Sequence, residues 1–150
     1  MFSRPGFLFT VNVRVPNTGI FTVDDSCPEF LFTVDDSRPK FIFTINDSGN
    51  EATVFELDYG ASVKQTHTLA LQNLDWEAIT GDDNFLYIAD IGNNKGKREN
   101  LAIHKVNRRH YDEISSVSVQ YQGNTPSDNF PYAHDFDAEA MVLAEGKLLI

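Results

Sequence analysis

Acidic side chains stand at every second position in two separate stretches of the chain. Asp75 and Glu77 alternate in DWE, and Asp135, Asp137 and Glu139 alternate in DFDAE. Side chains two residues apart on an extended backbone lie on the same face. Carboxylates gathered in this way repel one another, and Ca²⁺, which takes about six to eight oxygen ligands, relieves that repulsion. These five residues therefore form the predicted metal site.

Three further side chains near these stretches are candidate ligands. Asp47 and Asp90 each open a D-x-G-N segment, in NDSGN and ADIGN, and His134 directly precedes the second acidic stretch. D-x-G-N is also ordinary turn chemistry, because Asp and Asn bond the nearby backbone and Gly accepts a positive φ. Asp47 and Asp90 are therefore expected either to cap turns or to add ligands. His134 is a ligand, a base or a loop side chain on the surface.

The two glutamates have one structural alternative. A turn does not require a Glu followed by Ala and an apolar residue, yet Glu77-Ala78 and Glu139-Ala140 both have this arrangement. Each Glu either binds metal or accepts hydrogen bonds from backbone N–H groups and so holds neighbouring units together. Trp76 points to the opposite strand face and is expected to pack in the core. His67 and His104 lie in alternating strands and are expected to be exposed.

Repeats indicate what positions these residues. Asp75-Trp76-Glu77-Ala78 recurs as Asp137-Ala138-Glu139-Ala140, 62 residues later, and INDSGN at 45–50 recurs as IADIGN at 88–93. Residues 21–31 and 32–42 form a second, tandem repeat, with eight of eleven positions identical. Repeats at fixed or nearly fixed spacing are typical of propellers and solenoids.

Strand patterns fill the spaces between the repeats. TVFELD at 53–58, LAIHKV at 101–106 and SVSVQY at 116–121 alternate between apolar and polar residues. Ile79-Thr80 and FLYIAD at 85–90 flank GDDN, which predicts a hairpin. A four-stranded blade with variable loops accounts for both repeat spacings. The sequence predicts an all-β fold, a partial β-propeller of about two to three four-stranded blades.

The segments INDSGN, LDWEAIT (74–80), LYIADIGNN (86–94) and FPYAHDFDAEAM (130–141) carry a resemblance to a known group of proteins. Residues 43–150 resemble a largely uncharacterised group of bacterial β-propeller proteins, related to phytase-like, gluconolactonase-like and NHL-type propellers. This resemblance implies a calcium ion in a central channel and export to the periplasm or the cell surface. It also implies further blades beyond this N-terminal fragment, and the chain contains no clear signal peptide.

The resemblance divides the chain at its N-terminal repeat. Residues 1–42 form a Phe-rich tandem-repeat segment with no counterpart in the group, interpreted as a duplication or a disturbed start, and residues 43–150 form the blades. Unclosed blades expose strand edges, so the 150 residues are not expected to make a stable monomer alone.

Composition excludes several functions. The formal charge of −10 repels phosphate backbones, so no nucleic-acid partner is expected. No stretch is long and apolar enough to span a membrane. Cys27 is the single cysteine, which leaves no intrachain disulfide and no Cys-based metal site.

Two functions remain open. One is a binding or scaffold module for an unknown protein or small molecule, with a Ca²⁺ site. The other is a metal-dependent hydrolase, phytase-like or lactonase-like, in which Ca²⁺ and carboxylates activate water. No Lys or Arg stands inside DWEA or DFDAEA, which argues against phosphate chemistry in these segments.

Overall fold

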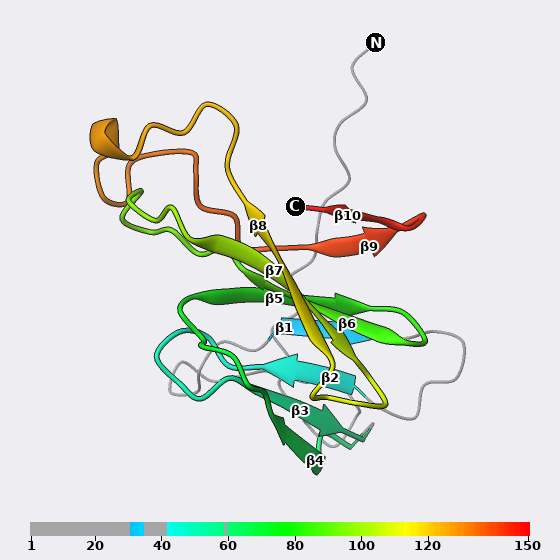
Figure 1. The fold of residues 1–150 in the computed structure, drawn as a ribbon. Helices are drawn as coiled ribbons and strands as arrows, with labels where there is room; N and C mark the ends of the chain where they lie inside the picture. The colour runs from blue at the N-terminus through cyan, green and yellow to red at the C-terminus, as the bar shows by residue number, and fades with distance from the viewer. Residues whose placement is uncertain (1–30, 35–41, 59) are drawn as a thin grey trace.

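A computed structural model of the chain describes residues 31–34, 42–58 and 60–150. This part of the chain is all-β, as the sequence predicts, and three antiparallel sheets account for its regular structure (Figure 1). Most of the tandem 11-residue repeat, and the proposed segment boundary at residue 42, lie outside the described residues or at their margin. No helix in the described ranges is long and apolar enough to cross a membrane.

The N-terminal sheet contains four strands in sequence order. They are β1 (Leu31–Val34), β2 (Ile42–Ile45), β3 (Thr53–Leu57) and β4 (Val63–Thr68), each antiparallel to the next. The loop between β2 and β3 holds the first D-x-G-N segment, and Gly49 there has a φ of 79°, a conformation that glycine adopts without a Cβ penalty. The turn interpretation of NDSGN is therefore confirmed for its glycine.

The central sheet repeats this meander. Its strands are β5 (Trp76–Gly81), β6 (Phe85–Asp90), β7 (Leu101–Asn107) and β8 (Ile114–Val119). The hairpin predicted around GDDN is the β5–β6 hairpin, in which Ile79 pairs with Ile88. Both residues are almost completely buried, and a buried Ile contributes about 1.5–3 kcal/mol through the apolar area removed from water.

The N-terminal and central sheets share one hydrophobic core. Phe43, Ile45 and Val54 from the N-terminal sheet pack with Trp76 and Ile88 from the central sheet. The indole of Trp76 is 1% exposed, so its predicted place in the core is confirmed. Alternation explains the packing of β6, where Leu86 and Ile88 face this core. In β5 a register shift between Trp76 and Ala78 lets Trp76 and Ile79 face the same core.

The opposite face of the central sheet packs against a short hairpin. The hairpin consists of β9 (Val142–Ala144) and β10 (Lys147–Leu149), and a single 3₁₀ turn, η1 (Pro126–Asp128), lies in the long connection before it. Met141 and Leu148 join Ala89, Ile91 and Ile103 in a second core. Two strands of this third sheet are present, where each of the other sheets has four.

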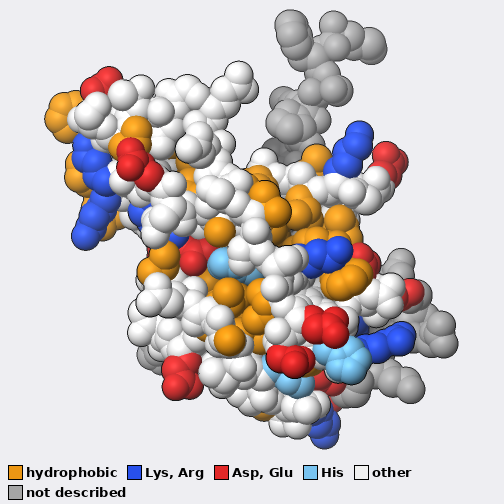
Figure 2. Space-filling model, viewed as in Figure 1, with side chains coloured by type: hydrophobic (Ala, Val, Ile, Leu, Met, Phe, Trp, Pro, Cys, Tyr) orange, Lys and Arg blue, Asp and Glu red, His pale blue; other side chains and the backbone are white. Residues whose placement is uncertain are grey.

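The third sheet leaves part of the central sheet uncovered. Val117 on β8 faces the same side as Ile103, its partner on β7, and 66% of its surface is exposed. Leu149 and Ile150 are also more than half exposed. Figure 2 shows hydrophobic side chains gathered in the middle of this view, between the β9–β10 hairpin and β8. An apolar surface over the outer strands β7 and β8 therefore remains available for further packing.

Candidate metal centre

Carboxylates from separate segments of the chain meet at the start of β5. Asp75 and Glu77 stand at the start of β5, and Asp47 lies in the loop that follows β2. One carboxylate oxygen from each of the three lies within 4.8 Å of the others, so this group could hold a metal ion. Glu139, in the segment before β9, interacts with Glu77. The negative charge of Asp137, in the same segment, raises the pKa of Asp75.

Glu77 is the most buried carboxylate of this group. It is 7% exposed, and the side chains that act on its carboxyl are those of Glu139, Asp75 and Asp47. Burial first, and these carboxylates second, raise the pKa of Glu77 to about 9. The Glu77 carboxyl forms a side-chain hydrogen bond with the carboxyl of Glu139, and no backbone N–H group of the described residues donates to it. The alternative in which Glu77 accepts bonds from backbone N–H groups therefore has no support in these ranges.

Opposing influences act on the pKa of Asp75, which is raised overall. Burial raises its pKa, while a hydrogen bond from Ser48 and the charge of Arg98 oppose that rise. The Arg98 guanidinium lies 4.0 Å from Asp75 Oδ2. Sequence reasoning missed this residue, because Arg98 belongs to a basic loop sequence, KGKR, that is typical of a solvated surface.

Gly92 allows the carboxylates to approach the backbone. A Cβ placed on Gly92 would lie 2.0 Å from Glu77 Oε1 and 2.5 Å from Asp75 Cγ. Its N–H also donates to the Asp75 carbonyl at 3.1 Å. In NDSGN the glycine serves a left-handed turn, whereas in ADIGN it makes room for the acidic cluster, so the two D-x-G-N segments use glycine for different reasons.

Two asparagines hold the acidic segments in place. Asn73 donates through Nδ2 to the carbonyls of Asn46 and Asp47 at 3.0 and 2.8 Å, and accepts from the Trp76 N–H at 3.2 Å. This side chain joins the N-terminal sheet to the start of β5. The position was not predicted, although Asn side chains often hydrogen-bond to nearby backbone groups in turns.

Asn93 joins the loop after β6 to the segment that leads to the third sheet. It is 1% exposed, its Nδ2 donates to the Phe136 carbonyl at 2.8 Å, and its N–H donates to Asp137 Oδ1. These bonds place the second acidic segment beside the first. Asp137 therefore accepts a backbone bond and also lies near the cluster.

Asp90 has a structural role that the sequence did not reveal. Only 2% exposed, it accepts hydrogen bonds from the N–H groups of Leu74 and Asp75 at 3.3 and 3.1 Å, and pairs with Arg98 at 2.6 Å. Burial would raise the pKa of Asp90, but interactions with His104 and Arg98 outweigh burial and lower it. Asp90 neither caps its own turn nor belongs to the three-carboxylate group.

The two strand histidines were predicted to be exposed, and this was wrong for both. His104 is 8% exposed, its Nδ1 contacts Ser116 Oγ at 2.7 Å, and its Nε2 lies 3.8 Å from Asp90 Oδ2. The ring of His67 stacks on Tyr111 with centroids 3.5 Å apart, so His67 is half-buried. Alternation places both side chains toward the packed face, and packing between the sheets then covers them.

The remaining predicted residues, Asp135 and His134, do not belong to the three-carboxylate group. Asp135 is exposed in a bend and lines a groove of about 400 Å³ with Ile91 and Ile150. In the 62-residue register it matches Asn73, not a carboxylate. His134 accepts a bond from the Phe136 N–H at 3.1 Å and stacks on the Phe136 ring. Ligand roles for Asp135 and His134 stay predictions.

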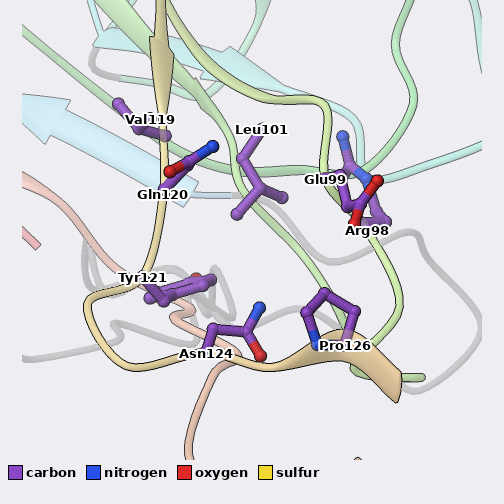
Figure 3. Close-up of a pocket in the computed structure, with 8 residues that line it drawn as sticks. All are labelled: Arg98, Glu99, Leu101, Val119, Gln120, Tyr121, Asn124 and Pro126. Carbon is purple, nitrogen blue, oxygen red and sulfur yellow. The ribbon is translucent and has the colours of Figure 1, made fainter.

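A second groove has Arg98 in its lining (Figure 3). It measures about 460 Å³, and its lining includes Arg98, Leu101, Val119, Tyr121 and Pro126. Tyr121 spans its floor by donating to the Ile91 carbonyl, while accepting from the Ala138 N–H. The side chains of Arg98, Tyr121 and Asn124 in this lining are engaged in hydrogen bonds within the fold.

No protein-family model matches the chain, and a search of curated proteins finds no match to its sequence.

Proposed function

We propose that this chain forms part of a β-propeller that works as a binding or scaffold module, with a Ca²⁺ ion held by the carboxylates at the start of β5. One observation carries the proposal: the carboxyl of Glu77 is buried, and the side chains that act on it are the carboxylates of Glu139, Asp75 and Asp47, with no positive charge among them. Burying an ionised group without a partner is costly, and a cation removes that cost.

Repetition of the architecture supports the propeller. The meanders β1–β4 and β5–β8 have the same strand order, and the acidic pairs Asp75-x-Glu77 and Asp137-x-Glu139 stand 62 positions apart, the first at the start of β5 and the second shortly before β9. The interaction of Glu77 with Glu139 is what a radial arrangement of equivalent strands requires. The apolar surface around Val117 is where the remaining strands of a third blade would pack.

Calcium is the metal that this ligand set favours. The candidate ligands are carboxylates, which are hard oxygen donors, and they come from three separate segments. Ca²⁺ accepts irregular oxygen shells of variable number, whereas Mg²⁺ demands a nearly ideal octahedron and retains its waters. Zn²⁺ prefers sulfur and imidazole ligands. The three-residue group contains carboxylates alone, and His134, the nearest histidine in sequence to these acids, is not part of it, so the group does not favour Zn²⁺.

The hydrolase alternative has weaker support. Phosphate-ester chemistry requires cations free to bind the anionic substrate, and Arg98, beside Asp75, is already bonded to Asp90 and to the Gly92 carbonyl. We therefore expect no turnover of phosphate esters or lactones by calcium-loaded protein. Turnover that depends on Ca²⁺ and disappears in Glu77→Gln would establish the hydrolase in place of the module.

Terbium luminescence tests the metal site directly. Trp76 is the single tryptophan of the chain and stands between Asp75 and Glu77, so it can sensitise a bound Tb³⁺ ion, which substitutes for Ca²⁺. We expect saturable luminescence that Ca²⁺ displaces and that Glu77→Gln with Glu139→Gln abolishes. Glu145→Gln, in the exposed β9–β10 turn, is the matched control and should retain the signal. Luminescence that is equal in all variants would reject the site.

The proposed export of the protein is supported by the resemblance of residues 43–150 alone. We expect the protein in the periplasm or at the cell surface. Fractionation of cells that produce the full-length gene product, with a cytoplasmic marker in parallel, checks this location.

A further inference from the structure

The side chain of Asp90 acts on the backbone that carries a candidate ligand. Its two oxygens accept the N–H groups of Leu74 and Asp75, and the carboxylate is 2% exposed. These two bonds therefore fix the backbone of Asp75, the residue directly before β5. Because the two hydrogen bonds are made by a charged acceptor, they are stronger than neutral ones.

Arg98 completes this arrangement from the loop after β6. Its Nη2 donates to Asp90 Oδ1 at 2.6 Å, and its Nη1 donates to the Gly92 carbonyl at 2.6 Å. Gly92 is the residue whose missing Cβ leaves room for Glu77 and Asp75. The guanidinium thus fixes the backbone on both sides of the acidic group, and places one positive charge 4.0 Å from Asp75 Oδ2.

We propose that Asp90 and Arg98 are positioning residues of the metal site, which bind no metal themselves but hold Asp75 and Gly92 where the ion is coordinated. This inference rests on the metal binding proposed above. Groups that orient metal ligands from behind typically change affinity by about 10- to 100-fold when they are removed.

Two mechanisms would give Arg98 an influence on the ion, and one substitution separates them. If Arg98 acts only through its charge, Arg98→Lys should bind metal as the wild type does, because the charge is kept. If Arg98 positions the backbone, Lys fails, because a single ammonium cannot reproduce the planar fork that reaches Asp90 and the Gly92 carbonyl together. The geometry predicts the second result.

The experiment measures Tb³⁺ affinity and the number of metal-bound waters in the full 150-residue chain, the latter from luminescence lifetimes in H₂O and D₂O. For Asp90→Asn and Arg98→Lys we expect affinity about tenfold weaker or more, and roughly one additional bound water as Asp75 withdraws. Asp112→Asn, which changes the same charge in the exposed β7–β8 turn, controls for net charge. Trp76 fluorescence during urea unfolding verifies that each variant is folded.

The outcomes separate the two proposals. A wild-type protein without saturable Tb³⁺ binding overturns the metal site, and the positioning role with it. Wild-type binding together with unchanged affinity and water number in folded Asp90→Asn and Arg98→Lys leaves the metal site standing and overturns the positioning role. Weaker binding in Asp90→Asn with full affinity in Arg98→Lys reduces Arg98 to a charge and also overturns its part of the inference.

Discussion

Replacing Glu77 with glutamine should stabilise the metal-free protein and, at the same time, remove its stabilisation by metal. Glutamine has nearly the shape of a protonated glutamate, so the buried site remains filled. It is neutral at every pH, whereas Glu77 stays neutral in the fold only by binding a proton that the unfolded chain releases. The substitution therefore isolates the cost of one buried carboxylate.

The sign and size of the effect follow from the pKa of Glu77. Folding raises this pKa from 4.5 to about 9, so above pH 4.5 the folded state keeps a proton that the unfolded state releases. The stability of the wild type consequently falls as the pH rises from 4.5 toward 9. At pH 7 the shift costs up to about 3 kcal/mol at 1.36 kcal/mol per pH unit, and relaxation of the site reduces this to about 1–3 kcal/mol.

Urea unfolding in EDTA, followed through the fluorescence of the buried Trp76, measures this cost. Glu77→Gln should exceed the wild type by about 1–3 kcal/mol at pH 7, and the two should agree near pH 4.5. With Ca²⁺ at 1,000 times its Kd the order should reverse, because the wild type gains about 4.1 kcal/mol and the variant gains nothing. Glu145→Gln should follow the wild type throughout.

A different pH profile would refute the reasoning. If Glu77→Gln is less stable than the wild type in EDTA, and the deficit is the same at pH 5 and pH 7, then the carboxylate has a donor partner. Glu77 would then be a structural acceptor and not a metal ligand.

Three other substitutions test the surroundings of the cluster. Gly92→Ala places a methyl group against Glu77 and Asp75, so it should weaken Tb³⁺ binding and lower stability by about 1–3 kcal/mol, and wild-type binding would contradict this packing. Asn93→Ala leaves the Phe136 carbonyl and the Arg98 N–H without their bonds, which should cost about 1–3 kcal/mol in urea unfolding and increase amide exchange in β9; unchanged exchange would refute the link to the third sheet. Ile88→Ala removes a fully buried side chain from the core between the sheets and should cost about 2–5 kcal/mol, whereas a loss below 1 kcal/mol would place Ile88 outside that core.

Local patterns were enough to predict the strands. The hairpin around GDDN, the alternation in TVFELD and LAIHKV, and the core position of Trp76 all follow from the two-residue period of a strand, which each segment contains within itself. Boundaries were less accurate: β8 begins at Ile114, although SVSVQY predicts a start two residues later. Cross-strand pairing of Ile114 with Val106, and packing of Ile114 against the core, extend the strand to this residue.

The acidic residues were found from the sequence, but their division of labour was not. Asp75 and Glu77 meet Asp47, whereas Asp90, in the matching D-x-G-N segment, pairs with Arg98. Equivalent positions in a repeat have different neighbours once the sheets are packed, because each loop faces a different partner segment. The repeat alone therefore could not separate ligands from supporting residues.

The sequence by itself determined that this protein is all-β, repetitive and acidic, because strand period, turn residues and charge are properties of neighbouring positions. Only the tertiary structure decided that Asp47 joins the first acidic pair and that His104 is buried. It also showed that Asn73, Asn93 and Arg98 hold the segments together. Those contacts join residues up to 44 positions apart, and a chain specifies such contacts through packing between sheets, which no local pattern contains.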